Sequence, residues 1–253
     1  METTSDRDGG MVRRFNLWRI IEHWVLILAF GVLVCTGLSQ RFYWVELSQW
    51  VILWLGGIDD VRQIHRWAGV AFAVLATQHL CVAVVGVGLL KWRPTMLVTA
   101  KDVKDAAHNI RYYIGIEDRP ARSERYDYKE KFMNWLVLTG ALVMTTTGLA
   151  LWFPMTVVRF MPGVMIPTAK ALHSNEALLI FILIAIWHVY DSIFSPDVFP
   201  IDTSIFTGNI SHKRMLTQHP LELERLEGSA DTSDADESND ATEKAPNAKE
   251  PTG

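Results

Sequence analysis

Two stretches of the chain each carry a pair of histidines inside an apolar run. Residues 65–79 read HRWAGVAFAVLATQH, and residues 172–188 read LHSNEALLIFILIAIWH. The histidines are fourteen residues apart in the first stretch and fifteen apart in the second. At about 1.5 Å and about 100° per residue of α-helix, both spacings cover about 21–22 Å and return to nearly the same face. Each helix would therefore present one imidazole near either surface of a hydrocarbon core about 30 Å thick.

Around these stretches, four apolar runs are long enough to cross a membrane. They cover about residues 17–38, 64–90, 132–153 and 172–194 of a 253-residue chain that is 49% hydrophobic. A run of about 20 apolar residues is the length that a transmembrane helix requires. The sequence therefore predicts an all-α membrane protein, a four-transmembrane-helix bundle over residues 17–194.

The segments outside these runs have their own character. We expect residues 1–16 to form a short cytoplasmic segment, and residues 195–227 a cytoplasmic extension. The acidic tail, residues 228–253, has no apolar pattern and is expected to be disordered. Residues 42–56 are aromatic but too short to span, which favours a segment on the outer interface. Residues 101–115 predict a short amphipathic helix on the cytoplasmic face.

The distribution of lysine and arginine predicts the orientation in the membrane. Ten of these residues lie between positions 91 and 131, in the connection between the second and third runs. The connections after the first and third runs carry only four, namely Arg41, Arg62, Arg159 and Lys170. Because basic residues accumulate on the cytoplasmic side, both termini and the long second connection are expected in the cytoplasm.

Charge and cysteine content exclude several classes of function. The net charge of −4 is mild and its acidic residues concentrate at the C-terminus, so no nucleic-acid partner is indicated. The two cysteines, Cys35 and Cys81, form no Cys-x-x-Cys-His motif and no cluster. The chain is therefore expected to hold neither a covalent c-type haem nor an iron–sulfur cluster.

Four histidines at matched depths in two helices favour two stacked haems, each iron bound by one imidazole from each helix. A polar, ionisable residue in a membrane helix usually marks function. The alternative, a neutral histidine that only hydrogen-bonds a neighbouring helix, suits a single residue better than four. His23, near the cytoplasmic end of the first run, is a fifth candidate. It could replace His79 at the inner haem, bind a third haem, line a quinone pocket, or simply lie at the interface.

Two other features fit bound haems. Arg66 lies on the outer side, where the positive-inside rule disfavours cations, so a haem propionate or a lipid phosphate is its expected partner. Glycines recur in the other two helices, where they would let a porphyrin approach the backbone or would serve ordinary helix packing. They are Gly31, Gly37, Gly140 and Gly148.

The two histidine stretches resemble the haem-binding helices of the cytochrome b subunit of quinol:cytochrome c oxidoreductases. The membrane region is also similar to the gamma (cytochrome b) subunit of respiratory formate dehydrogenases, over about residues 13–225. The second resemblance rests on WRIIEHW (18–24), YDYKEKFMNW (126–135), TTGLALWFP (146–154) and HVYDSIF (188–194).

The two resemblances agree on one haem and differ on the other. Both imply that His65 and His173 bind the outer haem. The formate dehydrogenase type implies His23 with His188 at the inner haem and has no counterpart of His79, whereas the quinol oxidoreductase type implies His79 with His188. Because His79 is present at the required interval, we expect His79 as the inner ligand, with His23 as the alternative.

The resemblance also implies a quinone site beside the inner haem. The formate dehydrogenase relatives place Asn and Gln ahead of their third helix, and the matching positions here are Asp127 and Glu130. Carboxylates there, and Asp191 three residues after His188, could move protons during quinone chemistry or could be ordinary solvated charges.

Taken together, the expectation is a subunit with two b-type haems in a bacterial cytoplasmic (inner) membrane. It would transfer electrons between a quinone, menaquinone or ubiquinone, and an extracytoplasmic iron–sulfur or multihaem cytochrome c partner. The partner would supply the substrate chemistry, because the chain is expected to hold no catalytic metal centre besides haem. The alternatives are a stand-alone transmembrane haem reductase of an external acceptor and a haem-free membrane anchor.

Overall fold

The computed structural model describes residues 10–195 and 198–228. The chain divides into two compact units. Of the described residues, unit 2 contains those within 13–98 and 129–210, and unit 1 contains residues 10–12, 99–128 and 211–228.

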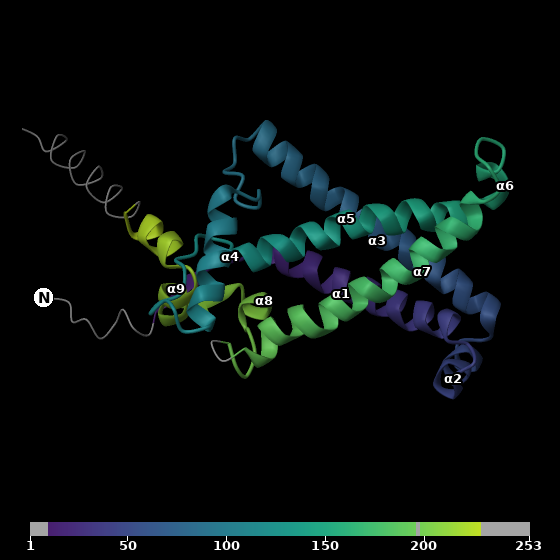
Figure 1. The fold of residues 1–253 in the computed structure, drawn as a ribbon, viewed down its shortest axis with the longest axis horizontal. Helices are drawn as coiled ribbons and strands as arrows, with labels where there is room; N and C mark the ends of the chain where they lie inside the picture. Colours follow the sequence, from purple (N-terminus) through teal and green to yellow (C-terminus); the bar gives the residue numbers. More distant parts are fainter. Residues whose placement is uncertain (1–9, 196–197, 229–253) are drawn as a thin grey trace, which may run out of the picture. The chain divides into compact units, whose positions relative to one another are not determined.

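Four long helices dominate unit 2 (Figure 1). Each is long and apolar enough to cross a membrane, which confirms the predicted four-helix membrane architecture. They are α1 (Leu17–Arg41), α3 (Ile58–Gly88), α5 (Tyr128–Trp152) and α7 (Met165–Leu183), and the last continues into two π-helical turns, η1 (Ile184–His188) and η2 (Tyr190–Phe194).

Short elements connect the long helices. Helix α2 (Glu46–Trp54) joins α1 to α3, and α6 (Pro154–Val157) joins α5 to α7, both at the same end of unit 2, on the right in Figure 1. After η2 comes α8 (Ser204–Thr207). Strands β1 (Met11–Arg13) and β2 (Asn209–Ser211) pair in a two-stranded sheet.

Two of the long helices begin six or seven residues before their apolar runs. Helix α3 starts at Ile58 rather than near residue 64, and α7 starts at Met165 rather than near residue 172. The first turn of α3 contains Asp59 and Asp60, which suit the positive end of the helix dipole. A hydropathy window locates only the apolar part of a helix, so it does not predict a polar first turn such as that of α3.

Apolar side chains cover the outside of the bundle. Leu28 on α1, Leu142 on α5 and Ile186 on η1 are 69%, 67% and 69% exposed, as expected for surfaces that face lipid tails. Small residues bring the helices together inside. A Cβ on Gly140 of α5 would lie only 2.6 Å from Cδ1 of Ile180 on α7, so these two helices pack in close contact.

Unit 1 is built around α4 (Ala100–Tyr113), which confirms the predicted short helix in this region. A capping box closes its N-terminus: Asp102 Oδ2 accepts hydrogen bonds from the backbone N and Oγ1 of Thr99. The unit also contains α9 (His212–Gln218) and a helical stretch at residues 220–228. Apart from residue 228, the acidic tail that we expect to be disordered lies outside the described residues.

Candidate haem-binding site

His65 of α3 and His173 of α7 lie together at the end of the bundle that we expect to face outward, and we call them the outer pair. Their ring centroids are 6.2 Å apart and their planes are inclined at 75°. A metal–imidazole bond is about 2 Å long and the ring centre lies about 1 Å beyond the nitrogen, so two imidazoles on one metal ion have centres about 6 Å apart. The separation of this outer pair therefore fits one iron between the two rings.

Two threonines select which nitrogen of each outer histidine is free to coordinate. Thr36 Oγ1 donates its only proton to Val32 O at 2.6 Å and lies 2.8 Å from His65 Nδ1. The hydroxyl must therefore accept from Nδ1–H, and this assigns the unprotonated nitrogen of His65 to Nε2. A neutral imidazole with a free Nε2 lone pair is a good axial ligand for haem iron.

The second outer histidine has the same arrangement on the other helix pair. Thr147 Oγ1 donates to Val143 O at 2.6 Å and lies 2.9 Å from His173 Nδ1. The contact between Thr147 of α5 and His173 of α7 thus repeats the contact between Thr36 of α1 and His65 of α3. Both rings then carry an Nε2 lone pair and no proton there, an arrangement that suits a shared metal ion better than direct contact.

Glycine follows each of these threonines and gives the histidine ring room. A Cβ on Gly37 would lie 3.3 Å from His65 Cε1, and a Cβ on Gly148 would lie 3.2 Å from His173 Cε1. Both distances are tighter than normal contact, so any larger residue would press on the ring. Of the four glycines singled out in the sequence, Gly37 and Gly148 thus serve the outer pair, and Gly140 serves helix packing.

Two arginines lie near the outer pair. Arg41, at the end of α1, donates to Ser174 Oγ and, at 3.1 Å, to Asn175 Oδ1, which follow His173 on α7. Arg66, next to His65, stacks over the ring of Trp152 with its Cζ 5.6 Å from the ring centroid. Arg41 therefore ties α1 to α7 directly beside the candidate ligand.

At the end of the bundle that we expect to face the cytoplasm, His188 lies opposite His23 of α1, and we call these two histidines the inner pair. Their ring centroids are also 6.2 Å apart, with the planes inclined at 58°. Nδ1 of His23 is buried and has no hydrogen-bond partner in the described part of the chain. A buried polar atom left without a partner is costly, which is a sign that the inner pair is shaped for a group that the protein chain itself does not supply.

A π-helical turn explains how His188 comes into line with His173. A spacing of fifteen residues in a regular α-helix overshoots four turns by about 60°. The π-turn η1 (Ile184–His188) follows His173 and ends at His188, and it takes up one residue more than an α-turn. Such turns often occur at functional sites, and this one corrects the phase of the inner ligand.

His79, the expected inner ligand, has a different partner in the structure. Its Nδ1 lies 2.9 Å from Glu22 Oε1 and 3.1 Å from Arg19 Nη1, and Arg19 also donates to Glu22 Oε2 at 2.9 Å. The Glu22 carboxylate holds the ring of His79 against α1. The structure thus puts the alternative, His23, and not His79 opposite His188.

The carboxylates predicted for a quinone site are held by cations and one indole. Asp191 Oδ2 accepts from Trp187 Nε1 at 2.8 Å, and its Oδ1 lies 3.9 Å from Lys129 Nζ. Glu130 accepts from Arg14 Nη2 at 2.6 Å. Both lie in unit 2 with the histidines, whereas Asp127 belongs to unit 1.

Comparison with known proteins decides the family. The family model for prokaryotic cytochrome b561 matches residues 14–198, which contain all five membrane histidines. The chain belongs to the prokaryotic cytochrome b561 family. It is a membrane cytochrome b that takes part in electron transfer, and the cofactor of this family is haem b.

Two relatives extend the comparison. The chain is 25% identical over 215 residues to the cytochrome b556 subunit of the nitrate-inducible formate dehydrogenase of Escherichia coli (strain K12), which covers 81% of this chain and 88% of the relative. It is 23% identical over 174 residues to the formate dehydrogenase cytochrome b556 subunit of Haemophilus influenzae, which covers 66% and 67% respectively.

The threonines of this cytochrome b are the site residues that sequence reasoning missed. A signal was present: the tripeptide Thr-Gly-Leu occurs at residues 36–38 in α1 and again at 147–149 in α5. In both places the threonine hydroxyl meets a histidine of the following membrane helix. The repeated tripeptide therefore marks two equivalent halves of one site.

Proposed function

We propose that this cytochrome b holds two b-type haems and carries electrons between a quinone and an extracytoplasmic redox partner, as a subunit of a respiratory oxidoreductase. His65 and His173 would bind the outer haem, and His23 and His188 the inner one. One observation carries the proposal: both histidine pairs have ring centroids 6.2 Å apart, and α7 with its continuation η1 contributes one histidine to each pair. On α1 the contacts to the two pairs, Thr36 and His23, are thirteen residues apart, or about 20 Å.

The bound haems would supply one-electron redox chemistry, and the chain would position them. Thr36 and Thr147 orient the outer imidazoles, and a hydrogen bond to Nδ1–H makes each a stronger ligand. Gly37 and Gly148 leave the space that these rings occupy. Arg66 is the cation that we assign to an outer haem propionate, because its neighbour His65 belongs to the outer pair.

The inner end would bind the quinone. Asp191 follows the inner ligand by three residues, and Glu130 lies at the start of α5. Their bonds to Trp187 and Arg14 hold both carboxylates in fixed positions, from which they would exchange protons with the quinone.

The partner would dock on the outer face. The relatives in E. coli and H. influenzae are cytochrome b556 subunits of formate dehydrogenases. We infer for this chain a comparable complex in the bacterial inner membrane, with an iron–sulfur or multihaem cytochrome c partner outside. The excess of lysine and arginine in the second connection supports cytoplasmic termini.

The test uses the purified full-length protein in liposomes. The reduced-minus-oxidised spectrum is expected to show b-type absorbance, and adding a quinol should reduce haem in a reaction that a quinone-site inhibitor blocks. Asp191→Asn should slow this reduction, whereas Asp118→Asn, an exposed loop residue of unit 1, should leave it unchanged. Absence of b-type absorbance would support a haem-free anchor, and haems inert to quinol would support a stand-alone reductase.

A further inference from the structure

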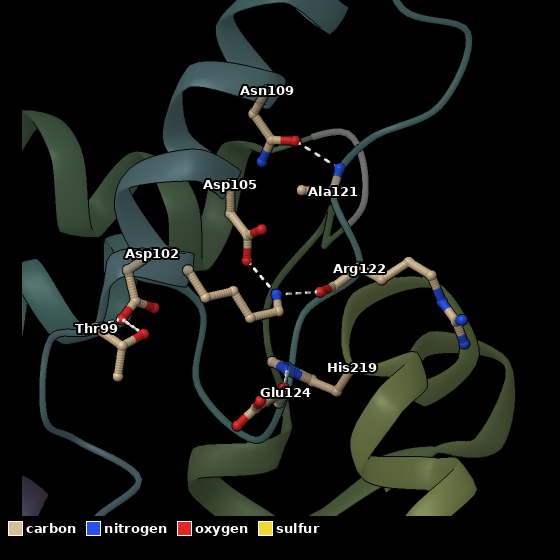
Figure 2. Close-up of polar contacts among 9 residues, drawn as sticks. Thr99, Asp102, Asp105, Asn109, Ala121, Arg122, Glu124 and His219 are labelled. Atoms are coloured by element: carbon tan, nitrogen blue, oxygen red, sulfur yellow. Dashed lines mark hydrogen bonds and ion pairs between the residues drawn. The ribbon is translucent and has the colours of Figure 1, made fainter.

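Helix α4 is oriented with its polar side toward its own unit and its apolar side outward. Lys101, Asp105 and Asn109 all contact residues 119–124 or one another, as Figure 2 shows. Asn109 Oδ1 accepts from Ala121 N at 2.7 Å, and Lys101 Nζ donates to Arg122 O at 2.9 Å. Asp102 and Asn109 are buried, although they are polar.

The loop beneath α4 is fixed in turn by the C-terminal helices of the same unit. His219 Nδ1 lies 2.9 Å from Glu124 O, and Leu221 N donates to Ser123 O at 3.3 Å. The polar side of α4 therefore packs on the loop at residues 119–124, and the C-terminal helices of the same unit hold this loop in place.

An arginine directly after these residues adds a charged contact to the same helices. Arg125 Nη1 donates to Glu222 Oε1 at 3.3 Å. Burial alone would lower the pKa of Arg125, but Tyr126 and Glu222 raise it above its ordinary value, so this cation stays charged. The guanidinium of Arg125 therefore holds the loop to the C-terminal helices through Glu222.

The opposite side of α4 exposes a continuous apolar face. Val103, Ile110 and Ile114 are 67%, 62% and 66% exposed, and with Ala107 they follow spacings of four, three and four residues. Residues at these spacings lie on one face of a helix. A helix that buries its polar side and exposes its apolar side needs a cover for the apolar side.

We propose that this cover is the surface of the membrane, and that Lys104 and Arg111 bind anionic lipid headgroups there. Both cations are exposed and lie beside the apolar face, at the spacing of seven residues that keeps them on the same edge. Arg111 also pairs with Glu117 at 3.0 Å, which leaves its other donors for a phosphate. An apolar face with cations at its edge is the pattern of a helix that lies in the lipid interface.

The short connection between α3 and α4 favours lipid over a separate protein partner as the cover of the apolar face. Helix α3, a candidate span, ends at Gly88, and Lys91, Trp92 and Arg93 follow it as residues typical of a membrane interface. Helix α4 begins seven residues after Arg93, at Ala100. Seven residues reach at most about 25 Å, so the start of α4 stays near the membrane surface.

The experiment measures membrane contact residue by residue in the full-length protein. Cys35 and Cys81 are first replaced by alanine, and a nitroxide is then attached through Val103→Cys, Ile110→Cys or, as control, Asp118→Cys. The protein is reconstituted in vesicles of phosphatidylcholine with phosphatidylglycerol. Labels at 103 and 110 are expected to collide severalfold more with oxygen than with a water-soluble nickel complex, and the label at 118 should show the reverse.

Charge reversal then tests the headgroup contact. Lys104→Glu with Arg111→Glu should bring the collision ratio at position 110 toward that of position 118, and vesicles of phosphatidylcholine alone should do the same. Labels at 103 and 110 that are as open to nickel as position 118 would overturn the proposal. Labels shielded from both reagents would also overturn it, because protein would then cover the face. If the collision ratio at position 110 changed neither on charge reversal nor in vesicles of phosphatidylcholine alone, the proposed role of Lys104 and Arg111 would be overturned.

Discussion

At the scale of single residues, Thr36 and Thr147 are the most informative side chains of the outer site. Each hydroxyl gives its proton to a backbone carbonyl and so must accept one from a histidine. This leaves His65 and His173 with the same free nitrogen. The two threonines therefore act as positioning residues, since they decide how the imidazoles are presented without touching the metal themselves.

Replacing Thr147 with valine keeps its shape but removes the acceptor for His173 Nδ1–H. We expect the haem affinity to fall by about 10–100-fold, the usual effect of losing such a partner. The midpoint potential of the outer haem should also rise, because a less basic imidazole stabilises ferric iron less. Both are measured by haem titration and by a redox titration of the purified protein.

Thr146→Val is the matched control for this prediction. Thr146 is the preceding residue on α5, is exposed, and donates to Leu142 O at 2.9 Å in the way that Thr147 donates to Val143 O. It should leave the affinity and the potential unchanged. If Thr146→Val and Thr147→Val changed the haem affinity and the potential equally, the hydroxyl of Thr147 would act only through its bond to the helix backbone.

Residue spacing predicts some of the site and leaves one choice open. The intervals between histidines fix which residues share a helix face, and the structure brings His65 and His173 together as expected. Spacing within one helix says nothing about which neighbouring helix that face meets. The choice between His23 and His79 depends on Glu22, a carboxylate of another helix that holds His79.

At the scale of elements, the π-turn η1 adjusts the register of the fourth membrane helix. Its residues, Ile184–His188, read as a plain apolar run, and no residue type in the sequence marks them as π-helical. The existence and order of the four long helices follow from hydropathy. The π-turn and the polar first turn of α3 do not, because they depend on packing and on the helix dipole.

Deleting Ala185 should convert this turn to regular α-helix and reduce the spacing from His173 to His188 from fifteen residues to fourteen. Because fourteen α-helical residues fall only about 40° short of four turns, both haems should be retained. Inserting one alanine at the same place requires a further π-turn between the two histidines, so the inner haem should be lost. The haem content of the two purified variants checks this, and loss of haem on deletion alone would contradict it.

At the scale of the whole molecule, the membrane helices bring together two histidine pairs. The outer pair joins α3 to α7 and the inner pair joins α1 to η1, the continuation of α7, and the ring centroids are 6.2 Å apart in both pairs. The bundle would thus place two redox centres along the membrane normal, one near each surface. Because the chain belongs to the prokaryotic cytochrome b561 family, the cofactor that we propose for these centres is haem b.

The number of haems per chain in single histidine variants tests this arrangement most directly. The pyridine haemochrome assay on purified protein should give two haems for the unmodified chain, one for His23→Ala and two for His79→Ala. His65→Ala, which removes an outer ligand, should give one. Two haems in His23→Ala together with one in His79→Ala would contradict the inner ligand pair, and a single haem in the unmodified chain would contradict the account as a whole.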